Sequence, residues 1–122
     1  MKKIFLIDDE SDFTELSKSV LSFSGFEVET SNDPEASLKK LLEGSYDAVL
    51  VDLMMPGMDG FSLVRSLRQD VRYAHTPIFV MSAKKLKDEE RKTLLLHKVQ
   101  FVPKPFEPNR LVDLVKQAVP SS

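Results

Sequence analysis

Short, uninterrupted apolar runs separated by helical patterns constrain the fold of this chain more than any other feature. Three runs are continuous, and a shorter apolar pair lies nearer the C-terminal end: residues 4–7, 48–51, 78–81 and 101–102. Continuous runs of this length are typical of strands buried on both faces, as in a parallel sheet covered by helices. Residues 26–30 alternate between apolar and polar side chains, which indicates a half-exposed strand nearer the edge of the sheet.

Helical patterns lie between these runs, where apolar residues recur three or four positions apart: Phe13, Leu16, Val20 and Phe23; Leu38, Leu41 and Leu42; Phe61, Val64 and Leu67; residues 86–96; and Leu111, Leu114, Val115 and Ala118. Asp33 and Pro34 resemble an N-cap followed by a first-turn proline, and Gly25 and Gly44 are predicted helix stops. Five strand–helix repeats predict an α/β fold with a doubly wound, five-stranded parallel sheet and five helices.

The composition predicts one domain over residues 1–122 and excludes several classes of function. A net charge of -2 provides no basic field for direct nucleic-acid binding or for an anionic membrane surface. The absence of cysteine removes disulfides and thiolate metal sites, and it fits a cytoplasmic protein. Apolar runs of about four residues are far shorter than the roughly 20 that span a membrane.

Side chains able to carry chemistry follow four of the predicted strands: Asp8, Asp9 and Glu10; Asp52; Ser82; and Lys104. Open parallel sheets bind ligands in the crevice beyond the carboxyl ends of their strands, so the predicted fold brings these residues together. Each residue taken singly has a simpler reading as a helix cap or a surface side chain. Their joint placement at the same end of the sheet indicates a site.

The chemistry of that site follows from its charges. Two carboxylates about 4 Å apart repel by roughly 4 kcal/mol at an effective dielectric of 20, so clustered acids require a cation or a nearby lysine. Oxygen ligands without cysteine or a local histidine favour Mg²⁺, with Mn²⁺ as the alternative. A carboxylate such as Asp52 can also attack phosphorus and form an acyl phosphate. Ser82 and Lys104 would then contact the phosphoryl oxygens.

Four segments carry a resemblance to a known family: "IFLIDDE", "VLVDLMMPGMDGFSLVRSLR", "TPIFVMSA" and "VPKPF". With these motifs the chain resembles the receiver domain of two-component response regulators, including the chemotaxis regulators, over nearly its whole length. The resemblance implies a flavodoxin-like strand order of 2-1-3-4-5. It also implies phosphorelay signalling, in which a histidine kinase or phosphotransfer protein phosphorylates Asp52. The resemblance further implies that the domain is not an enzyme but a phospho-acceptor that assists its own phosphorylation and dephosphorylation.

The resemblance assigns a metal-binding role to the acidic residues. Asp9 and Asp52 would bind Mg²⁺ directly, together with the backbone carbonyl of Met54. Asp8 would act through a metal-bound water. Met54 also stands at a position that tunes the phosphate lifetime in the family, as does Lys84. Because Met54 has no polar group to orient an attacking water, we expect slow self-dephosphorylation.

The resemblance further assigns the residues that respond to phosphorylation. Ser82 would hydrogen-bond the phosphoryl group, and Lys104 would pair with the acceptor carboxylate or its phosphate. Phe101 would turn inward when Ser82 shifts, which changes the surface of the fourth helix, fifth strand and fifth helix for an unidentified protein partner. The peptide bond before Pro105 is often cis in the family. The domain is expected to act as a monomer or weak dimer, without an attached output domain.

His97 and Lys98 replace a glycine–alanine pair that the family usually has after the fourth helix, so we expect His97 to adopt the left-handed C-cap conformation. Two other functions stay open from the sequence. One is a receiver-like interaction module that takes no phosphate. The other is an aspartyl-phosphate phosphatase of the haloacid dehalogenase type, although such enzymes carry a second aspartate where this chain has Met54.

Overall fold

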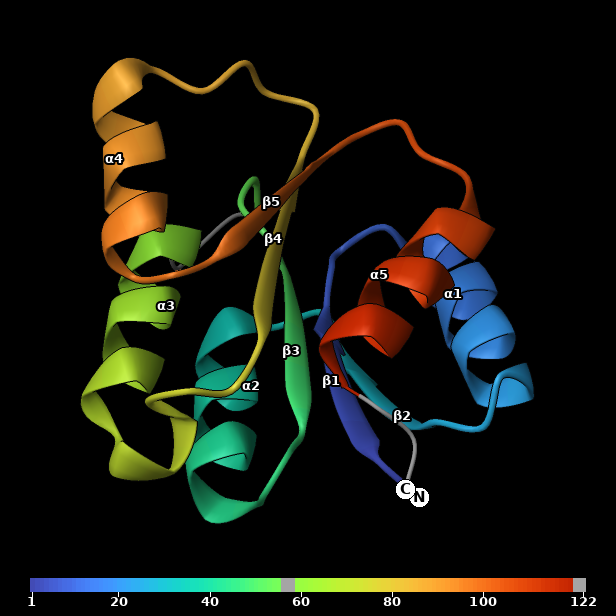
Figure 1. Cartoon of the computed structure of the whole chain (residues 1–122). Helices are drawn as coiled ribbons and strands as arrows, with labels where there is room; N and C mark the ends of the chain where they lie inside the picture. The colour runs from blue at the N-terminus through green and yellow to red at the C-terminus, as the bar shows by residue number, and fades with distance from the viewer. Residues whose placement is uncertain (56–58, 120–122) are drawn as a thin grey trace.

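A parallel sheet between two layers of helices forms the molecule, and its computed structural model describes residues 1–55 and 59–119 (Figure 1). Within these residues the elements are, in chain order, β1 (Lys3–Ile7), α1 (Ser11–Phe23), β2 (Glu27–Ser31), α2 (Pro34–Glu43), β3 (Ala48–Asp52), α3 (Gly60–Gln69), the short 3-10 helix η1 (Val71–Tyr73), β4 (Ile78–Ser82), α4 (Asp88–Leu96), β5 (Gln100–Pro103) and α5 (Pro108–Ala118). The strand–helix alternation predicted from the sequence is therefore confirmed.

The sheet has the order β2-β1-β3-β4-β5, and all its pairings are parallel, which confirms the predicted doubly wound topology. Helices α1 and α5 cover one face, and α2, α3 and α4 cover the other (Figure 1). Consecutive side chains of β1 alternate between the two cores: Ile4 and Leu6 face α1 and α5, whereas Phe5 and Ile7 face the other helices. Burial on both faces explains why the central strands read as continuous apolar runs.

The buried face of α1 differs from the apolar pattern that predicts this helix. Ser17 and Leu21 are fully buried, whereas Leu16 is half exposed and Phe23 is 94% exposed. Helix α1 is oriented so that Phe13 and Ser17, which lies one turn further along, both face the sheet. A small polar residue therefore occupies a core position. In α2 the predicted stripe is wrong at Leu42, which is 39% exposed. Helix α4 begins at Asp88, two residues later than the pattern predicts, and β2 is shifted by one residue.

The connection between α4 and β5 corrects one residue assignment. Lys98, with φ of 55°, adopts the left-handed conformation, and His97, with φ of -90°, does not. The amide of Lys98 donates to the carbonyl of Leu95, which closes the helix end. The side chain of Arg68 on α3 donates to the carbonyls of both His97 and Lys98, so a neighbouring helix holds the α4–β5 connection in place.

Two further observations bear on predictions from the sequence. The Lys104–Pro105 peptide bond is cis, as the resemblance implies. In the part of the chain that the structure describes, every helix is too short or too polar to cross a membrane.

Candidate functional site

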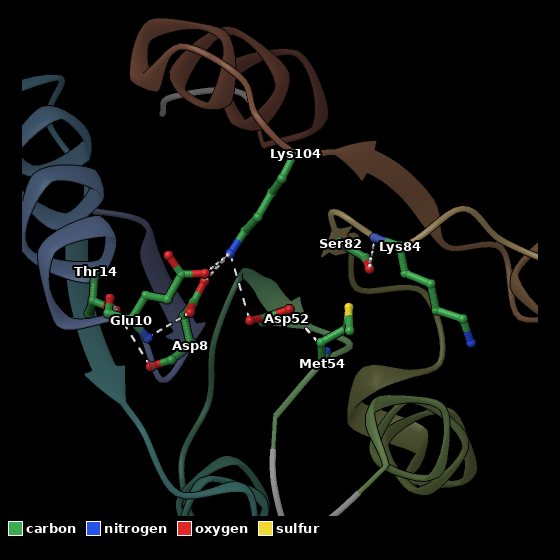
Figure 2. A network of polar contacts seen from close by, with 8 residues as sticks. All are labelled: Asp8, Glu10, Thr14, Asp52, Met54, Ser82, Lys84 and Lys104. Carbon is green, nitrogen blue, oxygen red and sulfur yellow. Dashed lines mark hydrogen bonds and ion pairs between the residues drawn. The ribbon is translucent and has the colours of Figure 1, made fainter.

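The carboxyl ends of four neighbouring strands bring the predicted site residues together (Figure 2). Asp8 directly follows β1, Asp52 and Ser82 are the last residues of β3 and β4, and Lys104 directly follows β5. The side chains of Asp8, Asp52 and Ser82 are almost completely buried. Carboxylates are rarely buried to this extent unless a cation or hydrogen-bond donors satisfy them.

The ammonium of Lys104 lies among three carboxylates (Figure 2). Its Nζ is 2.9 Å from Asp8 Oδ2, 3.3 Å from Glu10 Oε1 and 3.6 Å from Asp52 Oδ2. The ammonium also lies 4.4 Å from the ring centroid of Phe13, within cation–π range. Lys104 therefore contacts Asp52, as predicted, but Asp8 is the nearer partner.

The burial and the charges act against each other in this cluster. Burial raises the pKa of Asp8 above its ordinary value and the charge of Asp52 adds to this effect, while the hydrogen bond from Lys104 partly offsets it. Burial would lower the pKa of Lys104, but the hydrogen bond to Asp8 and the neighbouring carboxylates outweigh it and raise that pKa. A protonated lysine thus compensates part of the negative charge and leaves a site that favours a further cation.

The two oxygens of Asp52 have different surroundings. Oδ1 accepts a hydrogen bond of 3.0 Å from the amide of Met54, which fixes the carboxylate against its own loop. Oδ2 faces the ammonium of Lys104 (Figure 2). The side chain of Met54 is 57% exposed and adds no polar group beside the carboxylate. Residues 56–58, which complete the predicted turn after Asp52, lie outside the described residues.

A group of carboxylates able to hold a metal ion consists of Asp8, Glu10 and Asp52, each with an oxygen within 4.8 Å of the others. Glu10 belongs to the acidic motif after β1, but no feature of the motif distinguishes it from Asp9 as a metal ligand. Asp9, the predicted direct ligand, is exposed and lines a depression between the start of α1 and the end of β2. Its role in metal binding, and that of the Met54 carbonyl, stay predictions. The hard oxygen donors of this group match the ligand preference of Mg²⁺.

The predicted switch residues occupy the edge of the site next to β5. The hydroxyl of Ser82 accepts a 2.9 Å hydrogen bond from the amide of Lys84, so its own proton is not used in that bond. Phe101 pairs with Val80 in the sheet register and is half buried against the core under α3 and α4. Movement of either residue stays a prediction.

Comparisons with known proteins agree with this fold. The sequence profile of the family described as "Response regulator receiver domain" matches residues 4–116. The transcriptional regulatory protein CpxR of Escherichia coli K12 is 34% identical over 116 residues, which are 95% of this chain and 48% of that protein. A CpxR homolog of Haemophilus influenzae has the same identity over 95% of this chain and 49% of its own length. The chain thus spans about half the length of the curated relatives it matches.

Two solved structures extend the comparison. The chemotaxis response regulator CheY4 of Vibrio cholerae superposes with a TM-score of 0.87 at 27% identity, over 97% of this chain and 98% of that one. The response regulator protein TrrA of Thermotoga maritima, in complex with Mg²⁺ and BeF, gives a TM-score of 0.80 at 30% identity, over 97% and 99% of the two chains.

Proposed function

Because the chain belongs to the response regulator receiver domain family of two-component systems, we propose that Asp52 accepts a phosphoryl group from a histidine kinase or phosphotransfer protein. The observation that carries this proposal is the asymmetric environment of the Asp52 carboxylate. One oxygen is fixed by the amide of Met54, and the other faces an ammonium that can pair with a phosphoryl oxygen. A carboxylate that served as a helix cap would not lie beside the buried Asp8–Lys104 pair.

In the reaction an Asp52 oxygen attacks the phosphorus of a phosphohistidine. The new acyl phosphate O–P bond forms as the N–P bond of the donor breaks, and the donor imidazole leaves with the electron pair. Mg²⁺, when bound, would neutralise charge on the phosphoryl oxygens. Asp52 would hold it. The resemblance adds Asp9 and the backbone carbonyl of Met54 as direct ligands and Asp8 through a bound water, whereas the geometry groups Asp52 with Asp8 and Glu10.

The neighbouring residues would stabilise the product. Phosphorylation changes the charge at Asp52 to about -1.5 to -2 and adds acceptor oxygens. Lys104 already lies within reach of this carboxylate, and the hydroxyl of Ser82 has a proton to donate. A shift of Ser82 toward the phosphate would let Phe101 turn inward and alter the surface of α4, β5 and α5 for a protein partner.

Phosphorylation is tested by incubating the protein with acetyl phosphate and Mg²⁺ and measuring intact mass. We expect one added phosphoryl group that disappears in Asp52→Asn and persists in Asp113→Asn, an exposed aspartate of α5 that serves as the matched control. No added mass would favour an interaction module that takes no phosphate. Turnover of many phosphate esters would favour the phosphatase.

The third metal ligand is tested separately by Mg²⁺ titration of Asp9→Asn and Glu10→Gln. Each variant removes one negative charge from the acidic motif, so general electrostatics weaken binding in both. The residue that contacts the ion should lose more affinity, by tenfold or more, because a ligand bond disappears as well. Equal, small losses would show that neither residue is a ligand.

A further inference from the structure

A single carboxylate joins the loop after β4 to the first turn of α4. Glu90 Oε2 lies 2.7 Å from the ammonium of Lys84, and Glu90 Oε1 accepts a 2.8 Å hydrogen bond from the amide of Lys87. Lys84 in turn donates its own amide to the hydroxyl of Ser82. Ser82 is thus connected to α4 through two residues, and Glu90 is the one that anchors the connection on the helix.

This connection holds Lys84 away from the acceptor. The side chain of Lys84 extends away from Asp52 (Figure 2), toward the carboxylate of Glu90. The side chain of Glu90 is 19% exposed, and its hydrogen bond with Lys84 lowers the pKa of its carboxyl below the ordinary value. The carboxylate of Glu90 is therefore charged at neutral pH, and its side chain is partly shielded from solvent.

The Lys84–Glu90 ion pair opposes the proposed movement of Ser82. Because the amide of Lys84 is bonded to the Ser82 hydroxyl, a shift of Ser82 toward a phosphoryl group would pull the backbone of Lys84 along or break that bond. Either change strains the contact with Glu90, which is fixed to α4 by its second oxygen.

We infer that Glu90 is a positioning residue that holds the β4–α4 loop in its unphosphorylated arrangement through Lys84, so that a phosphoryl group on Asp52 must compete with this ion pair. The inference rests on the proposed phosphorylation of Asp52. Ion pairs of this exposure typically contribute little, and their usual range corresponds to about a 1.4- to 5-fold change in an equilibrium constant.

The test is a calorimetric titration of the Mg²⁺-loaded protein with beryllofluoride, a phosphoryl mimic, in Glu90→Gln, Lys84→Met and the double variant. Glutamine keeps an oxygen to accept from the amide of Lys87 and loses the charge. We expect both single variants to bind beryllofluoride about 1.4- to 5-fold more tightly, and the double variant to bind no more tightly than either single one. Glu89→Gln, which removes a charge from the same helical turn, is the matched control and should bind like the wild type.

Unchanged or weaker binding in Glu90→Gln, or additive effects in the double variant, would overturn the inference. A wild type that binds no beryllofluoride would instead refute the proposed function and, with it, this inference. Urea unfolding of the same variants distinguishes a merely structural role of Glu90, because such a role would lower stability without tightening the binding of beryllofluoride. Amide hydrogen exchange without Mg²⁺ adds a direct readout: the amide of Lys84 should exchange faster in Glu90→Gln, and unchanged exchange would contradict the loop contact. The amide of Lys87 keeps an acceptor in this variant and serves as the internal reference.

Discussion

Replacing Lys104 by methionine tests how the site balances its charges, because it removes the ammonium and keeps most of the side-chain volume. At an effective dielectric of 20, the attraction of Nζ is about 6 kcal/mol toward Asp8 at 2.9 Å and about 5 kcal/mol toward Asp52 at 3.6 Å. Desolvation offsets much of this attraction. Removing one partner of a buried pair nevertheless costs about 3–5 kcal/mol, because it leaves an uncompensated charge. We expect a loss near 3 kcal/mol in the free energy of unfolding at pH 7, since Asp8 can take up a proton.

The size of this loss should depend on pH. Burial already raises the pKa of Asp8, and removing Lys104 raises it further. As the pH falls through the pKa of folded Asp8, its carboxyl becomes neutral and no longer requires a cation, so the difference between variant and wild type should shrink. At alkaline pH the wild type should lose stability as the pH rises through the raised pKa of folded Lys104, and the variant lacks this change.

Urea unfolding followed by circular dichroism measures both effects in metal-free buffer. Lys84→Met is the control, because its ammonium is more exposed and pairs with Glu90 at the surface, and it should lose far less stability than Lys104→Met. Added Mg²⁺ should restore part of the stability of Lys104→Met by supplying positive charge. A loss below about 1 kcal/mol, or a difference that does not change with pH, would refute the compensation of buried Asp8 by Lys104.

Four further predictions concern stability and phosphate lifetime. Arg68→Ala should lower the free energy of unfolding by about 2–4 kcal/mol in urea, because Arg68 donates to backbone carbonyls of two separate loops, whereas exposed Arg65→Ala should cost little. Ser17→Ala should raise the melting temperature, by a stabilisation of about 1 kcal/mol, because its buried hydroxyl has no hydrogen-bond partner in the described structure. Lys98→Gly should stabilise by up to about 1 kcal/mol, and a loss of stability would contradict a left-handed residue there. The phosphoryl label on the phosphorylated wild type should persist well beyond seconds. Met54→Glu should shorten the lifetime of the phosphoryl group, because a carboxylate at this exposed position can orient an attacking water. Rapid loss of label from the wild type would refute the slow self-dephosphorylation expected from Met54.

The sheet could be predicted well because strands that are buried on both faces consist of continuous apolar residues. Each central strand is a continuous apolar run, and in β3 and β4 the polar residue that follows the run, Asp52 or Ser82, is the last residue of the strand. The strand order came from the resemblance and not from the runs, since apolar patterns say which residues are buried but not which strands are neighbours.

Local geometry was harder to predict wherever neighbouring residues had similar chemistry. Asp9 and Glu10 are adjacent acids, and their positions in the structure depend on how the chain turns from β1 into α1. His97 and Lys98 are likewise adjacent, and the helix end places the positive φ on the second of them. The buried Ser17 escapes a pattern search because its neighbours Leu16 and Val20 are more apolar. In each case packing decides between residues that are nearly equivalent in propensity.

The position of Lys104 supports the proposal that one site serves both a metal ion and a phosphoryl group. In the described structure its ammonium contacts three carboxylates and therefore leaves the site with excess negative charge, which favours Mg²⁺ before phosphorylation. If Asp52 is phosphorylated as proposed, the strongest anionic partner within reach would no longer be Asp8, and the ammonium would gain by shifting toward the new oxygens. The same lysine would thus stabilise the unphosphorylated site and favour phosphorylation, and the balance between its partners would set how readily the proposed change of state occurs.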